Sequence, residues 1–214
     1  MTRCVSALAA LLLAATPVDA AQRTLAPVDQ CSADAGFPAF RQALGRAVAR
    51  RDAAALKRLA APDVLVNFGG DSGWPAFSRQ WALDRPATSG LWAELARILP
   101  LGCARVGKAR ILPSFAGQFS ADDDQDVFEL MIVVERGAAL RDGPGSASAV
   151  RARLNWDVVT VLETSADDRL IKVRTGDGRE GWLGRSALRR LLDYRAVVEK
   201  RRGRWLITAF VAGD

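Results

Sequence analysis

The spacing of the hydrophobic residues in this 214-residue chain changes once, near residues 104–109, and that change limits the folds available to it. Before it, apolar side chains recur at helical spacing, as at Phe37 and Leu44, two helical turns apart. After it, they fall in short runs separated by turns rich in Gly, Asp and Pro, which is typical of antiparallel strands. We therefore expect an α+β protein with a mainly helical domain over 21–106 and a β-rich domain over 107–214.

Within the first half, Asp52 is predicted to cap a second helix, and Pro75 suits the first turn of a later one. A short strand is expected at 64–66, between these helices. In the second half the strand predictions end in a C-terminal hairpin over 194–212. Strands are predicted at 111–112, 128–134, 158–162, 170–174, 182–183, 195–199 and 205–211.

Part of the β-rich half carries an ordered series of short motifs. They are ALRDGPGS at 139–146, VTVL at 159–162, LIKV at 170–173 followed by GDG, and GWL at 181–183. In this order and spacing, the segment 137–191 resembles a bacterial SH3-like domain. The resemblance implies a small antiparallel barrel. One departure is Leu170, which stands where the family usually has Trp and so removes an aromatic that could stack on a ligand.

The flanking segments carry a second resemblance. The phrases RRDAAAL at 50–56, FGGDSG at 68–73 and GRWLITAFVAGD at 203–214 resemble uncharacterised exported bacterial proteins that carry an SH3-like domain. The same phrases are similar to parts of nuclear-transport-factor-2-like cones. That similarity would make the SH3-like segment an insertion into a cone domain. The pairing of 203–214 distinguishes the two arrangements, because the hairpin can pair with the SH3-like strands or with the strand near 64–68.

The first twenty residues have the pattern of a secretory signal peptide. Arg3 precedes an apolar run over 5–15, and small residues occupy the cleavage positions at 18–20. The run is too short for a good membrane span, and we expect no stable span elsewhere. Cys4 precedes the run and is therefore not the acylated cysteine of a lipoprotein. We expect a periplasmic or secreted protein whose mature chain begins near residue 21.

Only Cys31 and Cys103 remain after removal of the signal peptide. An even number of cysteines in an oxidising compartment predicts a disulfide between them. Two unpaired buried thiols are the alternative. No CxxC redox or metal motif is present.

Composition excludes several classes of chemistry. The chain has no histidine, which excludes Ser-His-Asp and Cys-His nucleophile pairs and histidine-ligated zinc. The acidic run at 122–126 lacks the Gly and the Glu that an EF-hand loop requires, so we expect no metal and no cofactor. The net charge of +6, mostly from arginine, favours anionic envelope components as partners. Nucleic acid fits less well, because export separates the protein from it.

A glycine-rich segment in the helical half is a possible binding loop, although a structural turn between strand and helix is the other interpretation. It lacks the Lys-Ser/Thr ending of a P-loop. As a turn, its glycines would let the chain reverse and Asp71 or Ser72 would cap the next helix. The residues of this loop are Gly69, Gly70, Asp71, Ser72 and Gly73.

Arg141, Trp182 and Arg185 are the predicted ligand-binding residues, since the turn 141–146 and the strand 181–183 meet in the SH3-like family. Trp182 would supply a stacking surface and the arginines would bind carboxylates. The hypothesis is a non-catalytic exported module that binds a cell-wall peptide, a glycan or an exported protein. The alternative is a cone-type small-molecule-binding protein or enzyme with an SH3-like insertion. Catalytic activity stays open, although no catalytic constellation is present.

Overall fold

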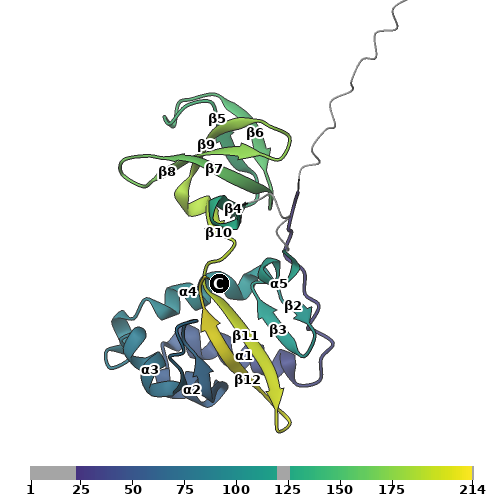
Figure 1. Cartoon of the computed structure of the whole chain (residues 1–214), viewed down its shortest axis with the longest axis vertical. Helices are drawn as coiled ribbons and strands as arrows, with labels where there is room; N and C mark the ends of the chain where they lie inside the picture. Colours follow the sequence, from purple (N-terminus) through teal and green to yellow (C-terminus); the bar gives the residue numbers. More distant parts are fainter. Residues whose placement is uncertain (1–22, 120–125, 214) are drawn as a thin grey trace, which may run out of the picture.

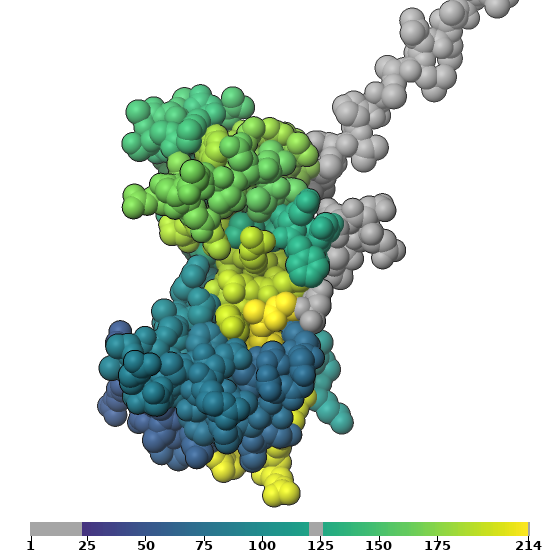
Figure 2. Space-filling model, turned by 60° about the vertical axis from the view of Figure 1, so that its left-hand side comes forward, coloured from purple at the N-terminus to yellow at the C-terminus, as the bar shows by residue number. Residues whose placement is uncertain are grey.

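A computed structural model describes residues 23–119 and 126–213 of the chain. The predicted signal peptide at 1–20, Cys4 and most of the acidic run at 122–126 lie outside the described residues. The chain forms two lobes, one mainly helical on one side of a sheet and one of strands, and the C-terminus lies between them (Figure 1). In the space-filling view the molecule narrows between the lobes (Figure 2). The predicted α+β class is confirmed.

The helices of the first lobe come from the sequence before residue 119. They are α1 (Phe37–Arg50), α2 (Ala53–Leu59), α3 (Gly73–Gln80), α4 (Leu91–Ile98) and α5 (Phe115–Gln118), with 3₁₀ turns η1 (Pro86–Thr88) and η2 (Leu99–Leu101). Helix α1 buries Phe37, Phe40 and Leu44 on the face that the spacing predicted. The side chain of Asp52 accepts a hydrogen bond from the Ala55 N–H at 2.8 Å, so the predicted cap of α2 is confirmed.

The first sheet gathers strands from both halves of the chain. Its strands are β1 (Ala60–Leu65), β2 (Ala104–Val106), β3 (Ala109–Leu112), β11 (Arg195–Arg201) and β12 (Arg204–Val211), in the order β1-β12-β11-β3-β2. Strand β12 runs parallel to β1 with Ala60 opposite Ile207, and β11 pairs antiparallel with β3. The C-terminal hairpin therefore belongs to the helical lobe.

That pairing corrects the expected boundary at residues 106 and 107. Strands β3, β11 and β12 lie in the range 107–214 but complete the sheet of the first lobe. The reason is physical: β11 and β12 carry buried Ala196, Val198 and Ile207, which pack into the same core as α1 and α4. The second lobe is thus inserted between β3 and β11.

The second sheet is antiparallel and open. Its strands are β4 (Leu130–Val133), β5 (Ala138–Arg141), β6 (Val150–Leu154), β7 (Val158–Thr164), β8 (Leu170–Thr175), β9 (Glu180–Gly184) and β10 (Leu188–Arg190), in the order β10-β4-β7-β8-β9-β5-β6. A 3₁₀ turn, η3 (Val127–Glu129), precedes β4, and another, η4 (Arg185–Ala187), links β9 to β10. Leu140, Val173 and Leu183 are buried in the core of this lobe.

The two lobes share a hydrophobic cluster and a buried arginine. Leu101 and Phe115 of the first lobe pack with Ile132 of the second. The guanidinium of Arg189, on β10, is 1% exposed and lies 3.1 Å from the carboxylate of Glu94 on α4. A charged group buried to this extent holds its position only while it is paired. The pair therefore fixes β10 against α4.

Cys31 and Cys103 are both fully buried and form a disulfide, with their Cα atoms 5.9 Å apart. The predicted pairing is confirmed. Gly102 lets the two segments approach, because its φ of 76° and the carbonyl oxygen of Val28, 2.2 Å from the place of a Cβ, leave no room for a side chain. No helix in 23–119 or 126–213 is long and apolar enough to cross a membrane.

Candidate functional site

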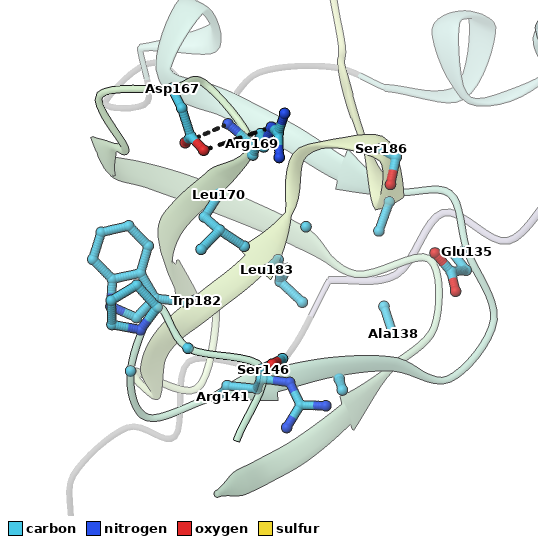
Figure 3. Close-up of a pocket in the computed structure, with 16 residues that line it drawn as sticks. Glu135, Ala138, Arg141, Ser146, Asp167, Arg169, Leu170, Trp182, Leu183 and Ser186 are labelled. Carbon is cyan, nitrogen blue, oxygen red and sulfur yellow. Dashed lines mark hydrogen bonds and ion pairs between the residues drawn. The ribbon is translucent and has the colours of Figure 1, made fainter. Parts of the chain in front are cut away.

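A groove of about 420 Å³ lies on the second lobe, and two of the three predicted ligand-binding residues line it. We call it the Trp182 groove. Arg141 and Trp182 come from β5 and β9, which are neighbouring strands. In Figure 3 the charged side chains surround the groove, and Leu170, Leu183 and Ala138 lie between them. The apolar floor therefore has a charged rim.

Gly181 brings the two predicted segments together. Arg141 lies directly opposite Trp182 in the antiparallel pair β5–β9. A Cβ at position 181 would lie 2.5 Å from the carbonyl oxygen of Arg141 and 2.8 Å from Cγ of Leu140. Only glycine permits strands to approach this closely. The predicted meeting of 141–146 with 181–183 is therefore observed, and its cause is the missing side chain at Gly181.

Trp182 is half-buried and belongs to the groove wall. Its neighbour Leu183 is 1% exposed and packs in the core, as expected from the alternation of side chains along a strand. Leu170 lines the same groove, so the position where the SH3-like family usually has an aromatic does face this site. The indole of Trp182 is the aromatic surface that the groove offers to a ligand.

Arg141 has a structural bond as well as a place in the groove. Its guanidinium Nη1 donates to the carbonyl oxygen of Ser148 at 2.7 Å, which anchors the loop between β5 and β6. Within that loop Gly143 packs against Ser148, whose Oγ lies 2.8 Å from the place of a Cβ. The other guanidinium nitrogens of Arg141 make no hydrogen bond with the described residues.

The rim carries charges of both signs. Asp167 and Arg169 form an exposed ion pair, with Nε 3.6 Å from the carboxylate. The Ser165 hydroxyl donates to Asp167 at 2.7 Å, and together with the backbone N–H of Arg169 it holds the pKa of that carboxyl below its ordinary value. Asp167 is therefore ionised at neutral pH. Glu135 contributes a second carboxylate on the far side of the groove (Figure 3).

Arg185 does not line the Trp182 groove. Its guanidinium Nη1 lies 3.3 Å from the carbonyl oxygen of Leu188, and its backbone N–H donates to the carbonyl oxygen of Arg169. The chain enters the 3₁₀ turn η4 at this residue, which directs the side chain along β10 instead. The sequence analysis missed Asp167, Arg169 and Glu135. They lie in a turn and a loop outside the short motif segments of the SH3-like resemblance, and no residue pattern marks them.

The glycine-rich loop 69–73 adopts a sharp turn between β1 and α3. Gly70 and Gly73 have φ values of 96° and 82°, which side-chain-bearing residues rarely adopt. The expected capping is not observed, because Ser72 makes no side-chain cap. The Asp71 carboxylate instead accepts a hydrogen bond from the Asn67 amide at 2.8 Å. The bond between Asn67 and Asp71 therefore closes the turn.

A small hollow of about 330 Å³ adjoins this loop. Asp71, Arg79 and Gln80 line it together with Val66 and Ala76. The interior of the first lobe beside it is filled by aromatic rings: those of Trp81 and Tyr194 lie 4.8 Å apart, between centroids, and both pack on Phe210. The loop therefore borders a shallow surface site, with an aromatic core behind it.

No protein-family model, curated protein or solved structure matches this chain. The residues of the site therefore carry the functional argument. In the Trp182 groove they offer an aromatic face, an apolar floor and charges of both signs, which are the elements of a binding site for a short polar segment.

Proposed function

We propose that the protein is an exported, non-catalytic binding module whose second lobe is SH3-like and recognises a short peptide of the bacterial cell envelope. The observation that carries the proposal is the Trp182 groove, where an indole and a guanidinium lie on neighbouring strands within a rim that carries charges of both signs. A wall peptide bears both carboxylates and amines, so it complements Arg141 and Arg169 on one hand and Asp167 and Glu135 on the other.

The architecture of the lobe supports the SH3-like part of the proposal. Strands β7, β8 and β9 are consecutive antiparallel neighbours, and the 3₁₀ turn η4 separates β9 from β10. The motif segments named in the sequence lie on β5, β7, β8 and β9. Export is supported by the disulfide, which fits an oxidising compartment, and by the predicted signal peptide.

The test is binding of purified cell-wall muropeptides and intact sacculi to the mature protein. Arg169→Ala removes a rim charge from a side chain that is 84% exposed, so the fold should be unaffected. Trp182→Ala removes the stacking face. We expect each to weaken muropeptide binding several-fold in titration calorimetry, and Arg169→Ala to reduce the salt sensitivity of retention on sacculi.

Arg185→Ala is the matched control, because it removes the same charge from the same region but not from the groove. It should bind as the parent does. If Arg169→Ala and Trp182→Ala, both folded by circular dichroism, bind muropeptides and sacculi as tightly as the parent, the Trp182 groove is not the binding site.

A second candidate function rests on the pairing of β12 with β1. This pairing favours the composite arrangement, in which a cone-type lobe carries the second lobe as an insertion. Such a lobe would bind a small molecule, and the hollow beside Asp71 is the place for it. Native mass spectrometry of the exported protein tests the idea: a co-purifying small molecule that is lost in Asp71→Asn would favour it, and its absence from the parent would count against it.

A further inference from the structure

The first lobe carries a second groove, which the proposed function does not use. It has a volume of about 790 Å³ and lies between the end of α2 and the β11–β12 hairpin. The tip of that hairpin projects from the end of the molecule opposite the second lobe (Figure 2). We call this second groove the basic groove. Its charged lining residues are Lys57, Arg58, Asp63, Arg201, Arg202 and Arg204.

Most of these cations have no counterion among the described residues. Asp63, the acidic residue among them, lies 2.6 Å from Arg201, which also faces Glu199. Lys57, Arg58, Arg202 and Arg204 make no ion pair with any carboxylate of the described residues. Nη2 of Arg204 instead donates to the backbone carbonyl of Arg58, at 3.2 Å. Four positive charges therefore share one hollow with no balancing charge of their own.

The positive surface continues along α1. A neighbouring hollow of about 270 Å³ shares Arg58 with the basic groove and adds Arg46 and Arg50, one helical turn apart. Asp52, the carboxylate in this hollow, is held by its capping bond to Ala55. Arg46 and Arg50 are four residues apart on α1, and like charges at this spacing on a helix repel one another. Binding of a polyanion would remove that repulsion.

The chemistry of the lining favours phosphate groups in a row. Guanidinium groups bind phosphate in a bidentate manner, and two adjoining hollows offer several of them in succession. No aromatic residue lines either hollow, so unpaired bases would have nothing to stack on. The exposed large apolar side chains of the described residues, such as Phe68 and Phe128, lie elsewhere, so neither hollow offers a side chain that would enter a bilayer.

We propose that the basic groove and the neighbouring hollow bind a linear polymer of phosphate groups. The protein would thereby contact an anionic polymer at one end and the ligand of the Trp182 groove at the other. This binding is independent of the proposed function, because the two grooves lie on different lobes.

The test uses the mature protein and inorganic polyphosphate as the probe, with orthophosphate, phosphatidylglycerol vesicles and single-stranded DNA as comparisons. The double variant R58Q/R202Q removes two exposed cations from the basic groove. We expect polyphosphate affinity to fall at least tenfold, and the slope of log K against log salt concentration to shrink by about two.

The matched control is R136Q/R151Q, which removes two exposed cations from the second lobe and changes the net charge equally. It should stay within twofold of the parent, as should Trp182→Ala. Equal weakening in both double variants would overturn the proposal, because it would mean attraction to net charge alone. Tighter binding to vesicles or DNA than to polyphosphate, or equal binding of orthophosphate, would overturn it as well.

Discussion

Replacing Gly181 with alanine tests the physical reason for the Trp182 groove. The added methyl group would lie 2.5 Å from the Arg141 carbonyl oxygen and 2.8 Å from Cγ of Leu140. An ordinary contact is about 3.4 Å or more, so β5 and β9 must separate by almost 1 Å to free the carbonyl oxygen, and Leu140 must shift as well. Leu140 is fully buried and β5 is paired on both sides, so neither can give freely.

Forced overpacking of this kind costs about 1–3 kcal/mol. We expect Gly181→Ala to lower the free energy of unfolding of the second lobe by that amount. Urea titration followed by tryptophan fluorescence, together with calorimetry to separate the transitions of the two lobes, would measure it. Muropeptide binding should fall too, because Arg141 and Trp182 would move apart.

Gly184→Ala is the control on the same strand. Gly184 has a φ of −63° and the nearest atom to a Cβ there is 3.8 Å away, so alanine fits without strain. It should be neutral or stabilise the protein by a few tenths of a kcal/mol through the unfolded chain. Equal stability of the two variants would refute the close approach at Gly181 as the cause of the groove.

Three further results are expected. Replacing both disulfide cysteines with alanine should cost up to about 4 kcal/mol, given the sequence separation of 72 residues; a loss below 1 kcal/mol in urea titration would contradict this. Arg189→Met should cost about 3 kcal/mol by leaving Glu94 with only the longer contact to Arg97, at 3.6 Å, and the added Glu94→Gln should restore much of the loss. The bonds from Arg179 and Thr175 lower the pKa of Asp177 to about 2, from 3.8. Its folded-state pKa is thus below the unfolded value, so its stabilisation is present above about pH 4 and lost toward pH 2; the stability gap between the parent and Asp177→Asn should narrow over that window.

Local features of the structure were predictable from the sequence. The cap at Asp52 was predictable because it depends on residues three apart, and most strands of the second half because alternation is a local pattern. The disulfide was predictable by counting, since two cysteines remain once the predicted signal peptide is set aside. That Arg141 and Trp182 line one groove was predictable because both residues lie in the ordered series of motifs.

The remaining features depend on contacts between distant segments. The pairing of β12 with β1 joins residues about 145 positions apart, and either pairing of the hairpin satisfied its alternating pattern. The 3₁₀ turn η4 sets the position of the Arg185 side chain. The burial of Arg189 depends on the carboxylate of Glu94, on a helix far away in the sequence. The basic groove likewise forms only where α2 meets the hairpin, so that charges which look like ordinary solvated residues in the sequence share one hollow. Sequence alone predicted the main helices and most of the strands, though not β2, β6 and β10, because local structure depends largely on neighbours along the chain. Tertiary structure alone decided which side chains meet, because burial and charge pairing depend on neighbours in space.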